Sequence, residues 1–245
     1  MATASARFAV SEPSVGLVPD GPFVKMLTKC DTAAKLPVAA YISLTGTPVD
    51  ADEMMRLGLV THRIDGTEMD SLTRHLSSAT LGANTVAVGD ALDLICGWQS
   101  NTCLDTAAAE VVRAAGSTPS SEEDGLPFGS ATTRAAIASC FSGSVEEAWS
   151  KLEGMEGEWA SNALSGMARC PALSLVATHR LLAECRGLSG SGAAALSERV
   201  ATRLAMGSCF GAVVEHGTRG TTAPPTTLAD LKAVHPDEVA ALFER

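Results

Sequence analysis

The chain has 245 residues, of which 46% are hydrophobic and 19% are charged, so it can bury a sizeable core and is not a disordered segment. Its formal net charge of −10 argues against a protein that binds nucleic acid by neutralising phosphates with Lys and Arg. We therefore expect little direct nucleic-acid contact. Membership of a ribonucleoprotein stays open, because a peripheral subunit could contact only other proteins.

The seven cysteines form no C-x-x-C pair, and no histidine lies at zinc-finger spacing from them. An odd number of cysteines in a chain of this length predicts reduced, buried thiols and no metal site. The sequence contains no run of 18 apolar residues, so we also expect no membrane contact. The cysteines stand at positions 30, 96, 103, 140, 170, 185 and 209.

The first expected element is a short strand at Phe8 to Val10, which ends where polar residues begin. Pro13 disfavours helical geometry at Glu12, and Gly16 permits a backbone conformation that other residues avoid. A second cluster of helix breakers surrounds Asp20. Glu12 and Asp20 are therefore expected on loops that flank a tight bend, where their carboxylates could converge on one cleft.

Two converging carboxylates would permit acid/base chemistry. One carboxylate in an apolar pocket can activate water while its neighbour binds or orients the substrate. Leu17 and Val18 would supply the apolar walls of that pocket. The alternative interpretation is that Glu12 and Asp20 are ordinary loop acids in a chain that has 28 acidic residues.

Helical patterns dominate the remaining sequence. Acids in the first turn predict a helix over 51–57, and Gly46 predicts the end of the helix before it. The stretch 81–129 shows no convincing period, and 117–125 is typical of a polar linker. The other expected elements are a helix over 38–45, a strand over 59–64, helices over 68–79, 144–152, 159–167 and 193–206, a long helix ending at Cys185, and a flexible break at 188–192.

The turn from Ser11 to Asp20 resembles the acid/base turn of the 3-hydroxyisobutyryl-CoA hydrolase branch of the crotonase (enoyl-CoA hydratase) superfamily. The resemblance runs from Phe8 to Phe243 and leaves out most of 81–129. It implies an α/β fold, an incomplete crotonase (ClpP-like spiral) core followed by a carboxy-terminal helical block. The other segments that carry it are Leu44 to His62, Ile137 to Glu147, Cys170 to Leu175 and Leu228 to Phe243.

The resemblance also implies a domain organisation. Residues 1–80 would form the second half of the crotonase-like core, and 81–130 would be a variable region with a polar linker. Residues 131–216 would form the carboxy-terminal helical block. Residues 217–245 would be a Thr/Pro-rich tail with a short terminal helix.

By resemblance, Glu12 is the carboxylate that activates water or attacks the thioester, and Asp20 is its partner near the substrate hydroxyl. The substrate would be a CoA thioester, and no cofactor would be required. Two departures argue against activity of the chain alone. The loops that supply the family's oxyanion hole would precede Met1, and Gly21 is followed by bulky residues where the family has three glycines. Loss of one oxyanion donor typically costs about 100- to 1000-fold in rate.

Two function hypotheses follow. The leading one is a degenerate hydrolase-like chain that serves as a structural subunit of a large assembly in the mitochondrial matrix, by family precedent the small subunit of the mitochondrial ribosome. The alternative is half of a split acyl-CoA thioester hydrolase of valine catabolism, completed by a second chain. Both require protein partners, including one that supplies the missing first half of the core. An incompletely represented ordinary hydrolase, another crotonase activity and an unrelated binding module also stay open.

Overall fold

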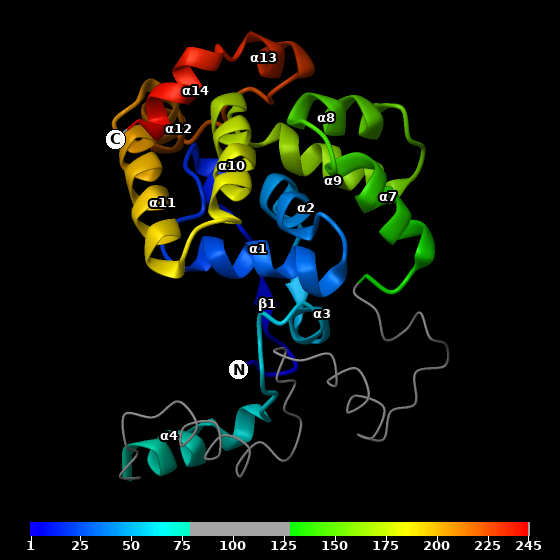
Figure 1. Cartoon of the computed structure of the whole chain (residues 1–245), viewed down its shortest axis with the longest axis vertical. Coiled ribbons are helices and arrows are strands. Elements are labelled where there is room, and N and C mark those ends of the chain that lie inside the picture. The colour runs from blue at the N-terminus through cyan, green and yellow to red at the C-terminus, as the bar shows by residue number, and fades with distance from the viewer. Residues whose placement is uncertain (79–127, 245) are drawn as a thin grey trace. The chain divides into compact units, whose positions relative to one another are not determined.

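The computed structural model describes residues 1–78 and 128–244, and the chain forms two compact units (Figure 1). The first, which we call the strand unit, combines Met1–Phe8 with Val49–Gly129. The second, the helical unit, combines Ala9–Pro48 with Ser130–Arg245. Each unit is therefore built from two separate stretches of the chain.

Among the described residues, the strand unit contains a two-stranded antiparallel sheet. In this sheet β1 (Arg7–Phe8) pairs with β2 (Val49–Asp50). The helix α3 (Ala51–Arg56) follows directly. The Asp50 carboxylate accepts a hydrogen bond from the Glu53 amide at 2.9 Å and so caps the first turn of α3. The helix predicted over 51–57 is confirmed.

Two predicted strands are wrong in extent. The strand predicted at Phe8 to Val10 ends at Phe8. The strand predicted over 59–64 is reduced to a single parallel bridge between Ala2 and Arg63. Ala2 donates to the His62 carbonyl at 2.9 Å and accepts from the Ile64 amide at 3.0 Å. A ladder needs a partner strand of matching length, and among the described residues this segment pairs with Ala2 alone.

The strand unit continues into a short 3-10 helix, η2 (Gly66–Glu68), and the helix α4 (Met69–Ser78). The helix predicted over 68–79 is thus confirmed as far as Ser78, and residue 79 lies outside the described residues. The polar linker predicted at 117–125 lies outside the described residues.

The helical unit consists of the turn η1 (Glu12–Val15) and helices from both of its chain stretches. Its helices are α1 (Phe23–Ala34), α2 (Val38–Thr45), α7 (Ala131–Phe141), α8 (Val145–Glu153), α9 (Glu158–Ala168), α10 (Ala172–Cys185), α11 (Gly190–Ala205), α12 (Ser208–Thr218), α13 (Leu228–Ala233) and α14 (Pro236–Phe243).

The centre of the helical unit is α2, and every one of its residues is buried. It packs against α1, α7, α9 and α10 (Figure 1). Gly46 ends the helix in a left-handed conformation at φ +64°, and its amide donates to the Ile42 carbonyl at 3.0 Å. Both the helix and its glycine stop agree with the prediction. A helix that is apolar on most faces needs neighbours on all sides, which explains its central place.

The predicted helices of the carboxy-terminal half are also confirmed. At the start of α8, the Ser144 hydroxyl accepts a hydrogen bond from the Glu147 amide at 3.2 Å. The break predicted at 188–192 is present but wrong in extent, because α10 ends at Cys185 and α11 already begins at Gly190. The Ser189 hydroxyl accepts from the Gly192 amide at 3.1 Å, and this cap outweighs the poor helix propensity of the glycines.

Across 1–78 and 128–244, no helix combines the length and the apolar character needed to cross a membrane. Cys30, Cys140, Cys170 and Cys185 are buried, as predicted, whereas Cys209 is only partly buried, so the prediction is wrong at that position. Burial raises the pKa of the Cys170 thiol to about 12 and that of the Cys185 thiol to about 11. These thiols therefore stay protonated and behave as small apolar side chains at neutral pH.

Candidate functional site

Glu12 is the first residue of the 3-10 helix η1. The sequence predicted a non-helical Glu12 because a proline follows it, and this part of the prediction is wrong. The turn is closed by main-chain bonds. The Leu17 amide donates to the Glu12 carbonyl at 3.0 Å, and the Gly16 amide donates to the Pro13 carbonyl at 3.1 Å. These bonds compensate the restriction that a proline imposes on the residue before it.

The Glu12 side chain lies in a partly buried environment. Its Oε2 atom is buried without a hydrogen-bond partner among the described residues. Buried polar atoms are nearly always hydrogen-bonded in folded proteins, so such an exception needs a reason. A carboxylate oxygen held free of protein donors can accept a proton or a hydrogen bond from a ligand or water.

Asp20 lies in a different environment. It is exposed, between the buried Pro19 and Gly21, which has a left-handed backbone at φ +67°. Its carboxylate makes no hydrogen bond or ion pair with the described residues. Glu12 and Asp20 both belong to the helical unit and share one stretch of turn, while their convergence on one cleft stays a prediction.

Side chains of α10 and α11, which were not predicted from the sequence, form hydrogen bonds to the turn that carries Glu12. The Ser174 hydroxyl on α10 donates to the Leu17 carbonyl, and the Ser197 hydroxyl on α11 lies 3.5 Å from the Gly21 carbonyl. Gly16, at φ +82°, lies so close to α12 that a Cβ atom there would be 3.3 Å from the Phe210 Cα. Glycine is therefore required at this bend for conformation and for space.

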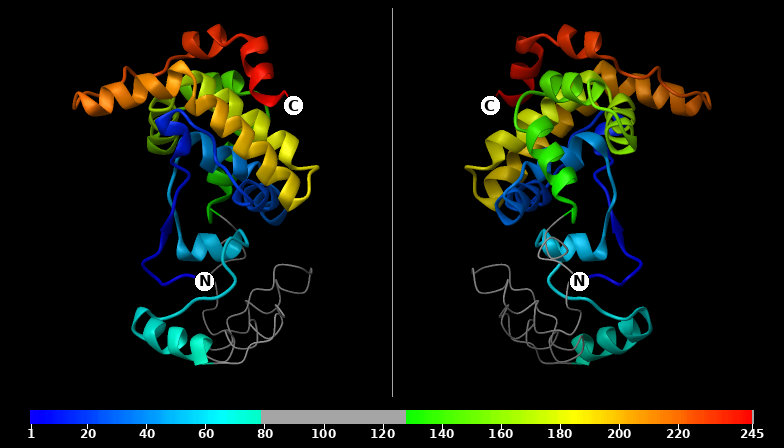
Figure 2. Two further views of the ribbon diagram at one scale, coloured as in Figure 1. Left: turned by 90° about the vertical axis from the view of Figure 1, so that its left-hand side faces the viewer. Right: turned by 90° about the vertical axis from the view of Figure 1, so that its right-hand side faces the viewer.

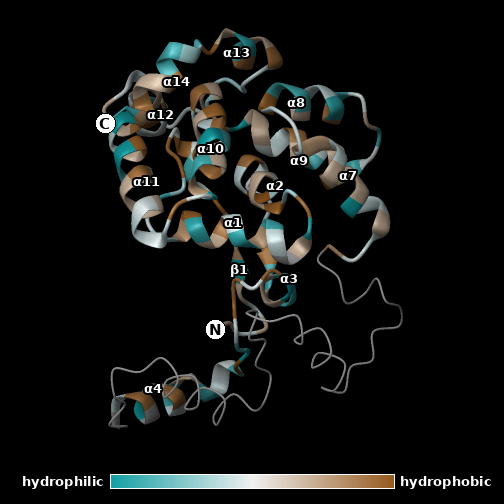
Figure 3. Ribbon diagram, in the orientation of Figure 1, coloured by the Kyte–Doolittle hydropathy of each residue, from teal (hydrophilic) through white to brown (hydrophobic). Residues whose placement is uncertain are grey.

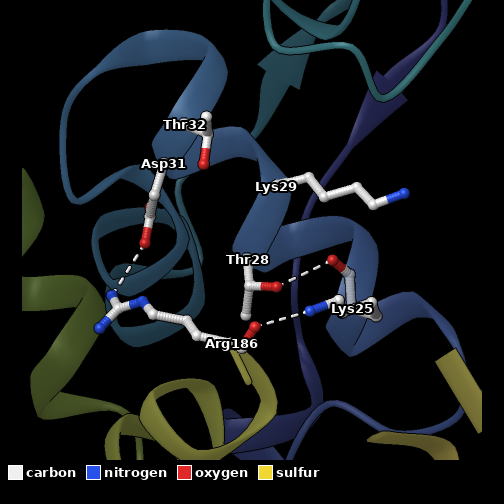
Figure 4. A pocket seen from close by; sticks show the side chains of 6 residues that line it. All are labelled: Lys25, Thr28, Lys29, Asp31, Thr32 and Arg186. Atoms are coloured by element: carbon white, nitrogen blue, oxygen red, sulfur yellow. Dashed lines mark hydrogen bonds and ion pairs between the residues drawn. The ribbon is translucent and has the colours of Figure 1, made fainter. Parts of the chain in front are cut away.

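One hollow of the helical unit, of about 300 Å³, lies between α1 and the end of α10 (Figure 4). Arg186 and Asp31 form an ion pair at 2.8 Å, and the Lys25 ammonium donates to the Arg186 carbonyl at 2.8 Å. These cations hold the carboxyl end of α10 against α1, which is a structural role. The hollow is lined by Lys25, Thr28, Lys29, Asp31, Thr32 and Arg186.

A second hollow, of about 390 Å³, lies along α11. Of its lining residues, Arg203 donates to the carbonyl oxygens of Ala241 and Glu244 at 2.7 and 2.9 Å, so it fastens the end of α14. Neither of these two hollows is lined by Glu12 or Asp20. Within the described residues, no group of three His, Cys, Asp or Glu side chains could hold a metal ion.

Comparison with known proteins identifies the fold. A family model described as Enoyl-CoA hydratase/isomerase matches residues 1–243. A carnitinyl-CoA dehydratase from Mycobacterium thermoresistibile is similar with a TM-score of 0.68 and 20% identity, covering 99% of this chain and 60% of that chain. An enoyl-CoA hydratase from Rhodobacter sphaeroides 2.4.1 is similar with a TM-score of 0.67 and 18% identity, covering 98% of this chain and 60% of that chain. No curated protein sequence matches significantly.

At these identities the likeness to the two solved structures concerns the fold alone, and the chain spans 60% of their length. The crotonase-type α/β fold predicted from the sequence is confirmed by this likeness. The incompleteness of its core stays a prediction.

Proposed function

Since the chain belongs to the enoyl-CoA hydratase/isomerase family, we propose that it acts on an acyl-CoA thioester and that Glu12 is the carboxylate that activates water. The more specific proposal is hydrolysis of a 3-hydroxyisobutyryl-CoA-type thioester, because the turn from Ser11 to Asp20 resembles the acid/base turn of the 3-hydroxyisobutyryl-CoA hydrolases. The observation that carries it is the buried Oε2 atom of Glu12, which has no partner among the described residues.

The chemistry needs one acceptor and one source of water. Glu12 accepts a proton from water while the water oxygen attacks the thioester carbonyl carbon. The carbon–sulfur bond then breaks, and the proton passes to the departing CoA thiolate, so the products are free CoA and the carboxylic acid. The exposed carboxylate of Asp20 would accept a hydrogen bond from the substrate hydroxyl.

Hydrolysis also requires donors for the negative charge that develops on the carbonyl oxygen. We propose that a protein partner supplies these donors, so that activity belongs to the assembled complex. No cofactor is needed for this reaction, because water is the co-substrate.

The test is the release of free CoA from 3-hydroxyisobutyryl-CoA by the tagged full chain, purified with its partners from native cells. Glu12→Gln retains the size of the side chain but removes the base. It should lower kcat at least about 100-fold, the usual range for a general base. Glu156→Gln, at an exposed glutamate, is the matched control and should leave the rate unchanged. Equal rates for Glu12→Gln and the unaltered chain would rule out this function.

A second candidate function is a structural subunit of a large mitochondrial assembly, for which the small subunit of the mitochondrial ribosome is the proposed example. The exposed helix α12 favours this candidate, because none of its residues is buried by the described parts of the chain. Its test is sedimentation of the tagged complex with identification of its proteins by mass spectrometry. Co-migration with ribosomal proteins without CoA release would support the structural role, whereas a small complex that releases CoA would support the enzyme.

A further inference from the structure

We propose that Ser174 and Ser197 are positioning residues that hold the turn carrying Glu12 and Asp20 through its main-chain carbonyls. The two serines come from successive helices, and they reach the turn on either side of Asp20, at Leu17 and at Gly21. The catalytic part of this inference rests on the proposed function, whereas the structural part does not.

Ser174 is the stronger of the two clamps. It is fully buried on α10, and its hydroxyl donates to the Leu17 carbonyl. The amide of the same residue, Leu17, donates to the Glu12 carbonyl at 3.0 Å. Leu17 is therefore bonded both to α10 through its carbonyl and to the backbone of Glu12 through its amide.

Ser197 forms the weaker clamp. It is also fully buried, on α11, and its hydroxyl oxygen lies 3.0 Å from the Ala194 carbonyl and 3.5 Å from the Gly21 carbonyl. A hydroxyl has one hydrogen, so the two carbonyls compete for it and the longer bond is the weaker. Removal of Ser197 should therefore disturb the turn less than removal of Ser174.

Such a clamp matters for Glu12 because its buried Oε2 atom has no hydrogen-bond partner among the described residues. The bonds to the backbone of the turn therefore contribute to holding the carboxylate in place. A catalytic group must keep its position within a fraction of an ångström, and an error of about 1 Å can cost roughly 100-fold in rate. Two buried donors on two packed helices meet this requirement.

Thr178 offers a matched comparison on the same helix. It lies one turn after Ser174 on α10 and is also fully buried, but its hydroxyl has no partner among the described residues. Substitution of Thr178 by Val removes a buried hydroxyl without removing a hydrogen bond to the turn. Any effect found for Ser174 and absent for Thr178 then belongs to the bond with Leu17 and not to the loss of a buried hydroxyl.

The structural part is tested by hydrogen exchange of the Gly16 and Leu17 amides in the full chain with its partners. Ser174→Ala should speed their exchange about 10-fold or more, because local opening of the turn becomes easier. Ser174→Cys, which keeps the volume and donates weakly, should have a smaller effect and serves if the Ala variant does not fold. Thr178→Val should leave both amides unchanged. Unchanged exchange in the Ser174 variants would overturn the clamp.

The catalytic part is tested on the same samples by CoA release. Ser174→Ala should lower kcat roughly 10- to 100-fold with little change in KM, because it displaces Glu12 but does not alter the surfaces that bind substrate. Ser197→Ala should give a smaller loss. Faster exchange with an unchanged kcat would overturn the positioning role. If the unaltered complex releases no CoA, the proposed function fails. The exchange measurement still shows whether Ser174 holds the turn in place.

Discussion

The helices α2 and α12 belong to the same unit and are both rich in apolar residues, yet their environments are opposite. All of α2 is buried, whereas none of α12 is buried by the described parts of the chain. Helices α1, α7, α9 and α10 pack against α2, while α12 packs against α11 and η1 and projects from the helical unit as the orange helix of Figure 2. Burial here is decided by the neighbours that the fold provides and not by the apolar content of the helix itself.

The composition of α2 explains why it can be surrounded. Figure 3 shows a helix in which few residues are hydrophilic, and its small residues, such as Ala39, Ala40 and Ser43, let other helices approach closely. The large apolar residue Ile42 fills the space between those helices and is fully buried. By contrast, Val214 on α12 is 45% exposed.

The largest effect is expected from truncation of a buried residue of α2. Ile42→Ala should lower the free energy of unfolding by about 3 to 4 kcal/mol, because it removes buried methylene groups and leaves a cavity. Val214→Ala on α12 should change it by less than about 0.5 kcal/mol. Urea unfolding followed by the fluorescence of Trp149 and Trp159, both in this unit, measures the two values. Similar losses of unfolding free energy for both variants would mean that α12 is covered in the free chain and that α2 and α12 do not differ in burial.

The sequence predicted α2 and most other helices because their signals are local. Gly46 as a helix stop acts on residues within a few positions, and this prediction is confirmed. The strand over 59–64 failed because pairing depends on a distant partner, and among the described residues Ala2 is the one that it meets. The exposure of α12 could not be predicted either, since it depends on which helices pack against it.

A second, somewhat smaller effect is expected at the contact between α9 and α2. A Cβ atom at Gly166 would overlap the Thr45 carbonyl oxygen, so Gly166→Ala must push the two helices apart. We expect a loss of about 2 to 3 kcal/mol in the free energy of unfolding, the usual cost of overpacking. The same unfolding measurement tests it. A loss below about 0.5 kcal/mol would show that the helices can separate without cost at this point.

The candidate site shows the same division between local and distant signals. The family resemblance pointed to Glu12 and Asp20, which lie eight positions apart on one turn. Ser174 and Ser197 were missed, because their bonds to the turn span 157 and 176 positions along the chain. A small polar residue between leucines, as at Ser174, is a weak signal, since Thr178 on the same helix is equally buried and has no partner among the described residues.

The smallest effect is expected when the same glycine-to-alanine change is made in α12. A Cβ atom at Gly211 would meet no atom of the described chain within 4 Å, and the backbone there is helical. Gly211→Ala should therefore raise the free energy of unfolding by about 0.5 to 1 kcal/mol through its higher helix propensity. Thus one chemical change should destabilise the protein at Gly166 and stabilise it at Gly211. A loss at Gly211 in the purified free chain would mean that its surroundings are already filled, and α12 would then have to be regarded as a buried helix like α2.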